Sequence, residues 1–212
     1  MKFVSKKLVS LLLISASVVA TLGGCAPLVI GGAVVGSMMA VDRRTSGTQI
    51  EDEGIELRAA ARLRENLNDR GHFNITSYNR QVLLTGEVPN AQDKQLVQQV
   101  VSTVPNVRAV VNELEVLGNS SMSQRTSDSL LTGQIKAGLV DARDLHASAF
   151  KVVTERGTVY LMGRVTQREA DRATSVARST GGVQKVVRLL EIISEEELRA
   201  MLPKPSAAEA SK

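Results

Sequence analysis

Few side chains in this sequence could carry out chemistry. The chain of 212 residues has one cysteine, Cys25, and two histidines, His72 and His146. These three residues cannot supply the three or four ligands of a usual zinc site, and a single cysteine cannot close an intramolecular disulfide. Neither histidine has a serine, cysteine or carboxylate at a spacing typical of a nucleophile and its base. We therefore expect no catalytic residue, no metal site and no cofactor.

Cys25 is the one side chain with a predicted chemical role. Residues 1–24 begin with lysines, continue into an apolar stretch too short to span a bilayer, and end in two glycines, as a cleaved export signal does. Leu22-Gly23-Gly24-Cys25 resembles the lipobox of bacterial lipoproteins, in which the cysteine is acylated. The resemblance implies a lipid-anchored protein, and Ala26 implies sorting to the outer membrane. An ordinary signal peptide with a chance cysteine is the alternative.

The charge of the mature chain argues against a nucleic-acid partner. The whole sequence has 26 basic and 22 acidic side chains and a pI of about 9.4. Removing the signal peptide deletes three lysines and no acid, which leaves the mature chain nearly neutral. A neutral exported protein lacks the electrostatic footprint of a nucleic-acid-binding domain.

The segment after the cysteine should connect the anchor to folded protein. Residues 27–41 are apolar and glycine-rich, and they are too short and too rich in glycine for a transmembrane helix. A segment that lies on the membrane and a partly ordered tether both fit this composition. Residues 42–49 are polar and should complete the connection.

The rest of the chain repeats itself at an offset of 76 to 77 residues. Val82–Val88 lines up with Val159–Val165, and both runs end in glycine, a charged residue and valine. Each copy predicts an amphipathic helix, two strands joined by a tight turn, a second helix and a valine-rich last strand, 107–116 or 183–193. Asp52 and Asp128 are predicted to cap or begin the first helices.

Two such units, with this strand motif and this last strand, resemble BON domains. The chain as a whole resembles the dual BON-domain outer-membrane lipoproteins of Gram-negative bacteria. The resemblance implies an α+β fold of two tandem αββαβ units, each a three-stranded sheet with two helices packed on it. The predicted organisation is a lipoprotein signal peptide (1–24), a lipid-anchored apolar segment and tether (25–50), a first BON domain (51–117), a linker (118–124), a second BON domain (125–193), and a short helix with a disordered tail (194–212).

The two units differ in charge. Residues 51–117 contain 7 basic and 10 acidic side chains, whereas residues 125–193 contain 11 and 7. In the resembling family the implied role is binding of anionic phospholipid, such as phosphatidylglycerol, at the periplasmic face of the outer membrane in support of envelope integrity, without catalysis. The positive second unit is therefore the expected lipid-binding unit. Ordinary solvated charge is the alternative explanation of its arginines.

The resemblance places the lipid contact on the first helix of the second unit, with Arg125, Leu130, Lys136 and Arg143 as its expected residues. Leu130 and its neighbour Leu131 point about 100° apart on a helix, so only one of them can lie fully in the core. Leu131 belongs to the core stripe, which leaves Leu130 for the membrane or for packing against the first unit. A rival hypothesis is a protein-interaction scaffold for envelope machinery, on which the basic surface is incidental.

Overall fold

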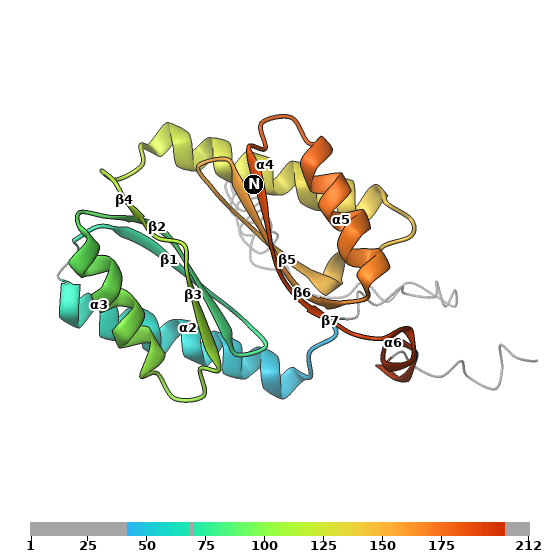
Figure 1. Ribbon diagram of the computed structural model, residues 1–212, viewed down its shortest axis with the longest axis horizontal. Coiled ribbons are helices and arrows are strands. Elements are labelled where there is room, and N and C mark those ends of the chain that lie inside the picture. The colour runs from blue at the N-terminus through green and yellow to red at the C-terminus, as the bar shows by residue number, and fades with distance from the viewer. Residues whose placement is uncertain (1–41, 68–69, 202–212) are drawn as a thin grey trace, which may run out of the picture. The chain divides into compact units, whose positions relative to one another are not determined.

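The computed structural model describes residues 42–67 and 70–201, and each repeat folds as a small α+β unit (Figure 1). The predicted fold class, two tandem αββαβ units, is confirmed. The first unit contains α2 (Ser46–Leu67), β1 (His72–Tyr78), β2 (Gln81–Val88), α3 (Ala91–Ser102), β3 (Ala109–Asn112) and β4 (Glu115–Val116). The second contains α4 (Met122–Asp141), a 3₁₀ turn (Ala147–Ala149), β5 (Phe150–Glu155), β6 (Thr158–Val165), α5 (Gln167–Ser179) and β7 (Lys185–Ile192), and α6 (Glu195–Met201) follows.

Each sheet is built around a central strand. In the first unit β2 pairs antiparallel with β1 and parallel with β3 and β4, and in the second β6 pairs antiparallel with β5 and parallel with β7. Both helices of a unit pack on one face of its sheet (Figure 1). The core stripes predicted from the four-residue spacing are buried there: Ile55, Ala59, Leu63 and Leu67 on α2, and Leu131, Ile135 and Leu139 on α4.

The prediction that Asp52 and Asp128 cap helices is wrong. Both lie inside their helices with buried carboxylates, and each accepts two backbone amides from the hairpin turn of its own sheet at 2.7–2.9 Å. The donors are Asn79 and Arg80 for Asp52, and Arg156 and Gly157 for Asp128. All four have positive φ, between 47° and 71°, as a two-residue type I′ turn requires. The carboxylate thus satisfies amides that the turn leaves unpaired.

Both first helices begin earlier than predicted. α2 begins at Ser46, inside the predicted tether, because the Thr45 hydroxyl accepts the Thr48 amide at 3.2 Å. α4 begins at Met122, inside the predicted linker, because Ser121 and Gln124 form a capping box. Short polar residues that are typical of connectors act here as helix caps.

The single last strand predicted over 107–116 is also wrong. β3 and β4 keep the same register against β2, Leu84 opposite Asn112 and Glu87 opposite Glu115, but the ladder is interrupted between them. Gly86 lies opposite the interruption and has a φ of 111°, which turns β2 out of the extended conformation. In the second unit β7 is continuous.

The glycine–charged–valine motif has a structural explanation in both units. A Cβ on Gly86 would lie 2.1 Å from the His72 carbonyl oxygen, and one on Gly163 would lie 2.4 Å from that of Ala149. Glycine is therefore required where the neighbouring strand begins. The next residue in each motif lies on the face opposite the helices, since side chains alternate along a strand.

Those opposite faces meet, so the two units share an interface. Tyr78 and Leu83 of the first sheet form an apolar cluster with Tyr160 and Met162 of the second. The buried Glu87 of the first motif accepts a hydrogen bond from Arg156 Nε of the second unit at 2.6 Å. The interface thus combines an apolar centre with charged contacts. Further polar contacts join the units, among them Asn74 to Glu155 at 3.0 Å, Lys151 to Glu56 at 2.8 Å and Asn79 to Glu191 at 2.6 Å.

The predicted polar connector also belongs to this interface. The Arg43 guanidinium makes two hydrogen bonds of 2.7 Å to the Glu169 carboxylate of α5 and one to the Arg164 carbonyl oxygen, and it is almost fully buried. Its neighbour Arg44 stacks over the Tyr78 ring at 4.3 Å and pairs with Asp52 in the first unit. Residues 43 and 44 therefore hold both units at once.

Candidate functional site

Helix α4 presents two apolar faces. Its core face is buried against β5 and α5, and its opposite face contains Met122, Leu130 and Val140, whose exposed fractions are 76%, 65% and 69%. At 100° per residue these three side chains lie within about 80° of one another. Gly133 and Ala137, also exposed, lie between them. We call this set of five residues the outer stripe of α4.

The outer stripe extends along most of the helix. Met122 and Val140 are separated by about 27 Å at 1.5 Å per residue. Exposed aliphatic side chains that share one face of a helix make the outer stripe a candidate interaction surface. The sequence predicted Leu130 and missed Met122 and Val140, although both follow from placing the stripe opposite Leu131, Ile135 and Leu139. Leu130 is not buried against the first unit.

The predicted basic residues do not all lie together. Lys136 and Arg143 are exposed, and neither has an ion pair within the described part of the chain. Lys136 flanks the outer stripe. Arg125 is half-buried on the side of the helix facing the first unit, where its Nε donates to the Ser120 hydroxyl at 3.1 Å. The structure therefore brings Leu130 and Lys136 onto one accessible surface, places Arg143 just beyond the helix end, and separates Arg125 from them.

Arg125 borders a small cleft of about 340 Å³ between the units, together with His72 and Glu155. Burial and the positive charge of Arg125 lower the pKa of His72, so this imidazole is neutral at neutral pH. Burial, with the charges of Glu87 and Asp128 nearby, raises the pKa of Glu155. These shifts arise from burial and from neighbouring charges at a packed interface.

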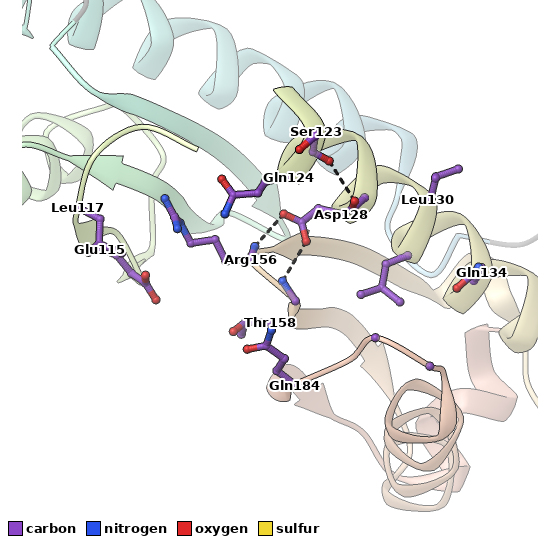
Figure 2. Close-up of a pocket in the computed structure, with 15 residues that line it drawn as sticks. Glu115, Leu117, Ser123, Gln124, Asp128, Leu130, Gln134, Arg156, Thr158 and Gln184 are labelled. Atoms are coloured by element: carbon purple, nitrogen blue, oxygen red, sulfur yellow. Dashed lines mark hydrogen bonds between the residues drawn. The ribbon is translucent and has the colours of Figure 1, made fainter. Parts of the chain in front are cut away.

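A larger cleft, about 720 Å³, adjoins the first half of α4 (Figure 2). Leu130 lies at its edge, and Asp128 is held by the turn amides of Arg156 and Gly157, as the dashed lines show. Arg156 is already engaged by Glu87 and by the Gly118 carbonyl oxygen. The remaining polar side chains around the cleft are uncharged amides and hydroxyls, apart from Glu115: Ser123, Gln124, Ser127, Gln134, Thr158 and Gln184. Such groups can hydrogen-bond a ligand but cannot provide acid–base chemistry at neutral pH.

The described residues form neither a metal cluster nor a membrane-spanning helix. No three histidine, cysteine, aspartate or glutamate side chains within 42–67 and 70–201 are placed to hold a metal ion. No helix in those ranges combines the length and the apolar character needed to cross a bilayer. The predicted lipidation residue, Cys25, lies outside the described residues.

Comparison with known proteins identifies both repeats. The model of the BON domain matches residues 51–118 and residues 127–194. Outer membrane lipoprotein DolP of Haemophilus influenzae is 39% identical over 175 residues, which cover 81% of this chain and 90% of that protein. The 21 kDa hemolysin of Actinobacillus pleuropneumoniae is 32% identical over 155 residues, covering 72% of this chain and 80% of that protein.

Osmotically-inducible protein Y of Escherichia coli is 28% identical over 144 residues, which cover 66% of this chain and 72% of that protein. None of these three names describes an enzyme. Two family matches that together span most of the described residues, and relatives aligned over most of their own length, agree with the duplicated fold. This chain belongs to the BON-domain family, among the dual BON-domain outer-membrane lipoproteins of Gram-negative bacteria.

Proposed function

We propose that this protein is a non-enzymatic, lipid-anchored component of the outer membrane, faces the periplasm, and binds anionic phospholipid through the outer stripe of α4. Phosphatidylglycerol is the type of lipid that we expect. The outer-membrane location follows from its family, and the lipid anchor at Cys25 is a prediction from the sequence. Support of envelope integrity is the biological role that we infer from such binding.

One observation carries the proposal: three large aliphatic side chains, Met122, Leu130 and Val140, are exposed along one face of a helix in the positively charged unit. Inserting one leucine into the acyl boundary contributes about 1.5–3 kcal/mol at most. Each nearby cation contributes about 1 kcal/mol at an anionic surface, and Lys136 and Arg143 are free to do so. A covalent lipid anchor would raise the local concentration and make contacts of this size sufficient.

The test is vesicle binding by the body that the structure describes, residues 42–201, produced without the anchor. Binding to phosphatidylglycerol vesicles should exceed binding to phosphatidylcholine vesicles and should weaken with salt. Leu130→Glu should weaken it by about a hundredfold, because it removes an apolar contact and adds a repelled charge, while Leu130→Trp should strengthen it. Cosedimentation or surface plasmon resonance measures both.

Ile50→Glu is the matched control, since Ile50 is equally exposed but lies on α2 of the first unit. It should leave vesicle binding unchanged. Thermal unfolding of all variants should be similar, because none of these side chains is in the core. Unchanged affinity in Leu130→Glu would assign the lipid surface to another part of the protein.

A further inference from the structure

The first unit has exposed apolar side chains that the proposed lipid surface does not explain. On α2, Ile50 is 71% exposed and Leu57 is 69% exposed. Leu57 borders a groove of about 510 Å³ between α2 and β1, whereas Ile50 lies outside it. Three half-buried apolar side chains complete the apolar lining of the groove: Ala60, Phe73 and Ile75.

The strand that borders this groove is unpaired on its outer side. Among residues 42–67 and 70–201, β1 is the terminal strand of its sheet and pairs only with β2. Residues 72–75 are less buried than residues 76–78, which the second unit and the start of α2 cover. An extended segment placed along residues 72–75 could pair with this edge and direct every second side chain into the groove.

The charges around the groove favour a protein segment over an anionic membrane. Glu53 and Glu56 lie at one end of it and Arg64 at the other. Glu56 is engaged by Lys151, but the exposed Glu53 has no ion pair in the described ranges. The first unit carries 7 basic against 10 acidic side chains over residues 51–117. With Glu56 paired, the remaining charged side chains of the groove are one acid, Glu53, and one base, Arg64. Opposite charges at its two ends suit an extended segment with complementary end charges better than a uniformly anionic lipid surface.

The internal repeat shows that the two corresponding faces have diverged. At an offset of 76 residues, Leu57, Ala60 and Arg64 of α2 correspond to Gly133, Lys136 and Val140 of α4, which form or flank the outer stripe. In the second unit this face is the exposed outer stripe of α4, with the basic Lys136 beside it. In the first unit it is a groove with an acidic end.

We propose that the α2–β1 groove docks an extended segment of another envelope protein. The segment adds to the edge of β1, places alternate aliphatic side chains against Leu57, Phe73 and Ile75, and has a basic residue beside Glu53. This interaction goes beyond the proposed lipid binding and does not depend on it.

The experiment uses the full chain in zwitterionic detergent and defined peptides as probes. The first is a blocked heptapeptide with lysine at its start, glutamate at its end, and leucine alternating with threonine between them. In the second peptide serine replaces the leucines, and in the third glutamate replaces the lysine. Amide resonances of residues 57 and 72–75 should shift with the first peptide, and the other two should bind about tenfold more weakly.

Two pairs of variants test the contacts. Leu57→Ser should weaken binding of the first peptide about tenfold, while Ile50→Ser, at an equally exposed position outside the groove, should leave it unchanged. Wild-type protein should prefer the first peptide, which begins with lysine, to the third, which has glutamate at both ends. Glu53→Lys should reverse this preference, so that the third peptide binds more tightly than the first. Glu65→Lys changes an exposed acid of the same helix outside the groove and should not reverse it.

Several results would overturn the proposal. One is a peptide that shifts resonances on α4 instead of the groove, and another is equal weakening by Leu57→Ser and Ile50→Ser. A third is loss of phosphatidylglycerol-vesicle binding in Leu57→Ser with peptide binding intact, which would make α2 a membrane contact. Because peptide binding is measured without vesicles, its failure leaves the lipid proposal standing, and the reverse also holds.

Discussion

Glu87 and Glu155 are both buried at the interface between the units, but their surroundings are opposite. Burial alone would raise the pKa of Glu87, yet the Ser120 amide and the Arg156 guanidinium hold this pKa below its usual value. Within the described part of the chain, the Asn74 side-chain amide is the one donor to Glu155, so burial and the neighbouring carboxylates raise the pKa of Glu155. The ionised form of Glu87 therefore stabilises the interface, whereas ionisation of Glu155 is disfavoured there.

Substitution by glutamine should therefore act in opposite directions at the two positions. At pH 7, Glu155→Gln should raise the free energy of unfolding by on the order of 1 kcal/mol, because it removes a disfavoured charge and keeps an acceptor for Asn74. The gain should vanish below about pH 4, where Glu155 is protonated in both states. Urea unfolding between these pH values measures it.

Glu87→Gln is the matched comparison, and it should lower the free energy of unfolding at pH 7 by about 2–3 kcal/mol. Because the pKa of Glu87 is lowered on folding, its contribution is present above the usual glutamate pKa and is lost as the pH falls through the folded-state value. The loss should thus shrink in acid. Changes of the same sign at pH 7 in both variants would contradict this account of the interface.

At the scale of elements, glycine has two different roles. In a strand it can be required because a neighbouring backbone approaches closely, whereas in a helix it can be merely tolerated. Gly163 in β6 faces the Ala149 carbonyl oxygen, and an added Cβ would lie 2.4 Å from it. Gly133 on the outer stripe of α4 has nothing within 4 Å of such a Cβ. The same residue type is therefore a packing requirement in one element and a weakness in the other.

The two alanine substitutions should separate these roles. Gly133→Ala should stabilise the protein by about 0.5–1 kcal/mol through helix propensity, and it should preserve vesicle binding because the stripe stays apolar. Gly163→Ala should destabilise it by about 2 kcal/mol or more, since β5 must move away from β6. Thermal denaturation of both variants is the measurement. A stable Gly163→Ala protein would show that the start of β5 can relax at little cost.

At the scale of the molecule, two arginines inside the predicted tether, Arg43 and Arg44, hold the two units together. The Arg43–Glu169 pair is nearly fully buried and joins positions 126 residues apart, and Arg44 binds the first unit beside it. Arg43 and Arg44 therefore belong to the interface between the units. An isolated second unit would lose this pair and expose Tyr160 and Met162, so binding experiments require both units.

Arg43→Ala should lower the free energy of unfolding by about 3–5 kcal/mol, because it leaves the Glu169 carboxylate buried without its cation. Hydrogen exchange should increase most at the start of α5, where Glu169 also forms the capping box with Thr166. Arg58→Ala, which breaks the exposed pair with Glu51, should cost less than about 1 kcal/mol. Equal effects of the two variants would mean that Arg43 does not clamp the units.

Local sequence patterns were sufficient to predict the fold of each unit. The four-residue spacing of Ile55, Ala59 and Leu63, the alternation along β2 and β6, and the repeat offset all concern residues close in sequence, so they predicted both αββαβ units and the exposure of Leu130. The same patterns failed where a side chain works at long range. Asp52 and Asp128 are at the start of helical patterns, as caps are, but their partners are turns 27 to 29 residues away.

The composition of the sequence by itself determined the charge difference between the units and the absence of a sequence motif for catalysis, because these depend on residue types alone. Only the tertiary structure decided that the sheets face each other, that Arg43 is buried against Glu169 of α5, and that Arg125 is separated from Leu130. The physical reason is that burial of a charge or exposure of an apolar side chain depends on which surfaces the other unit covers. Residues more than a hundred positions apart in the chain supply that cover.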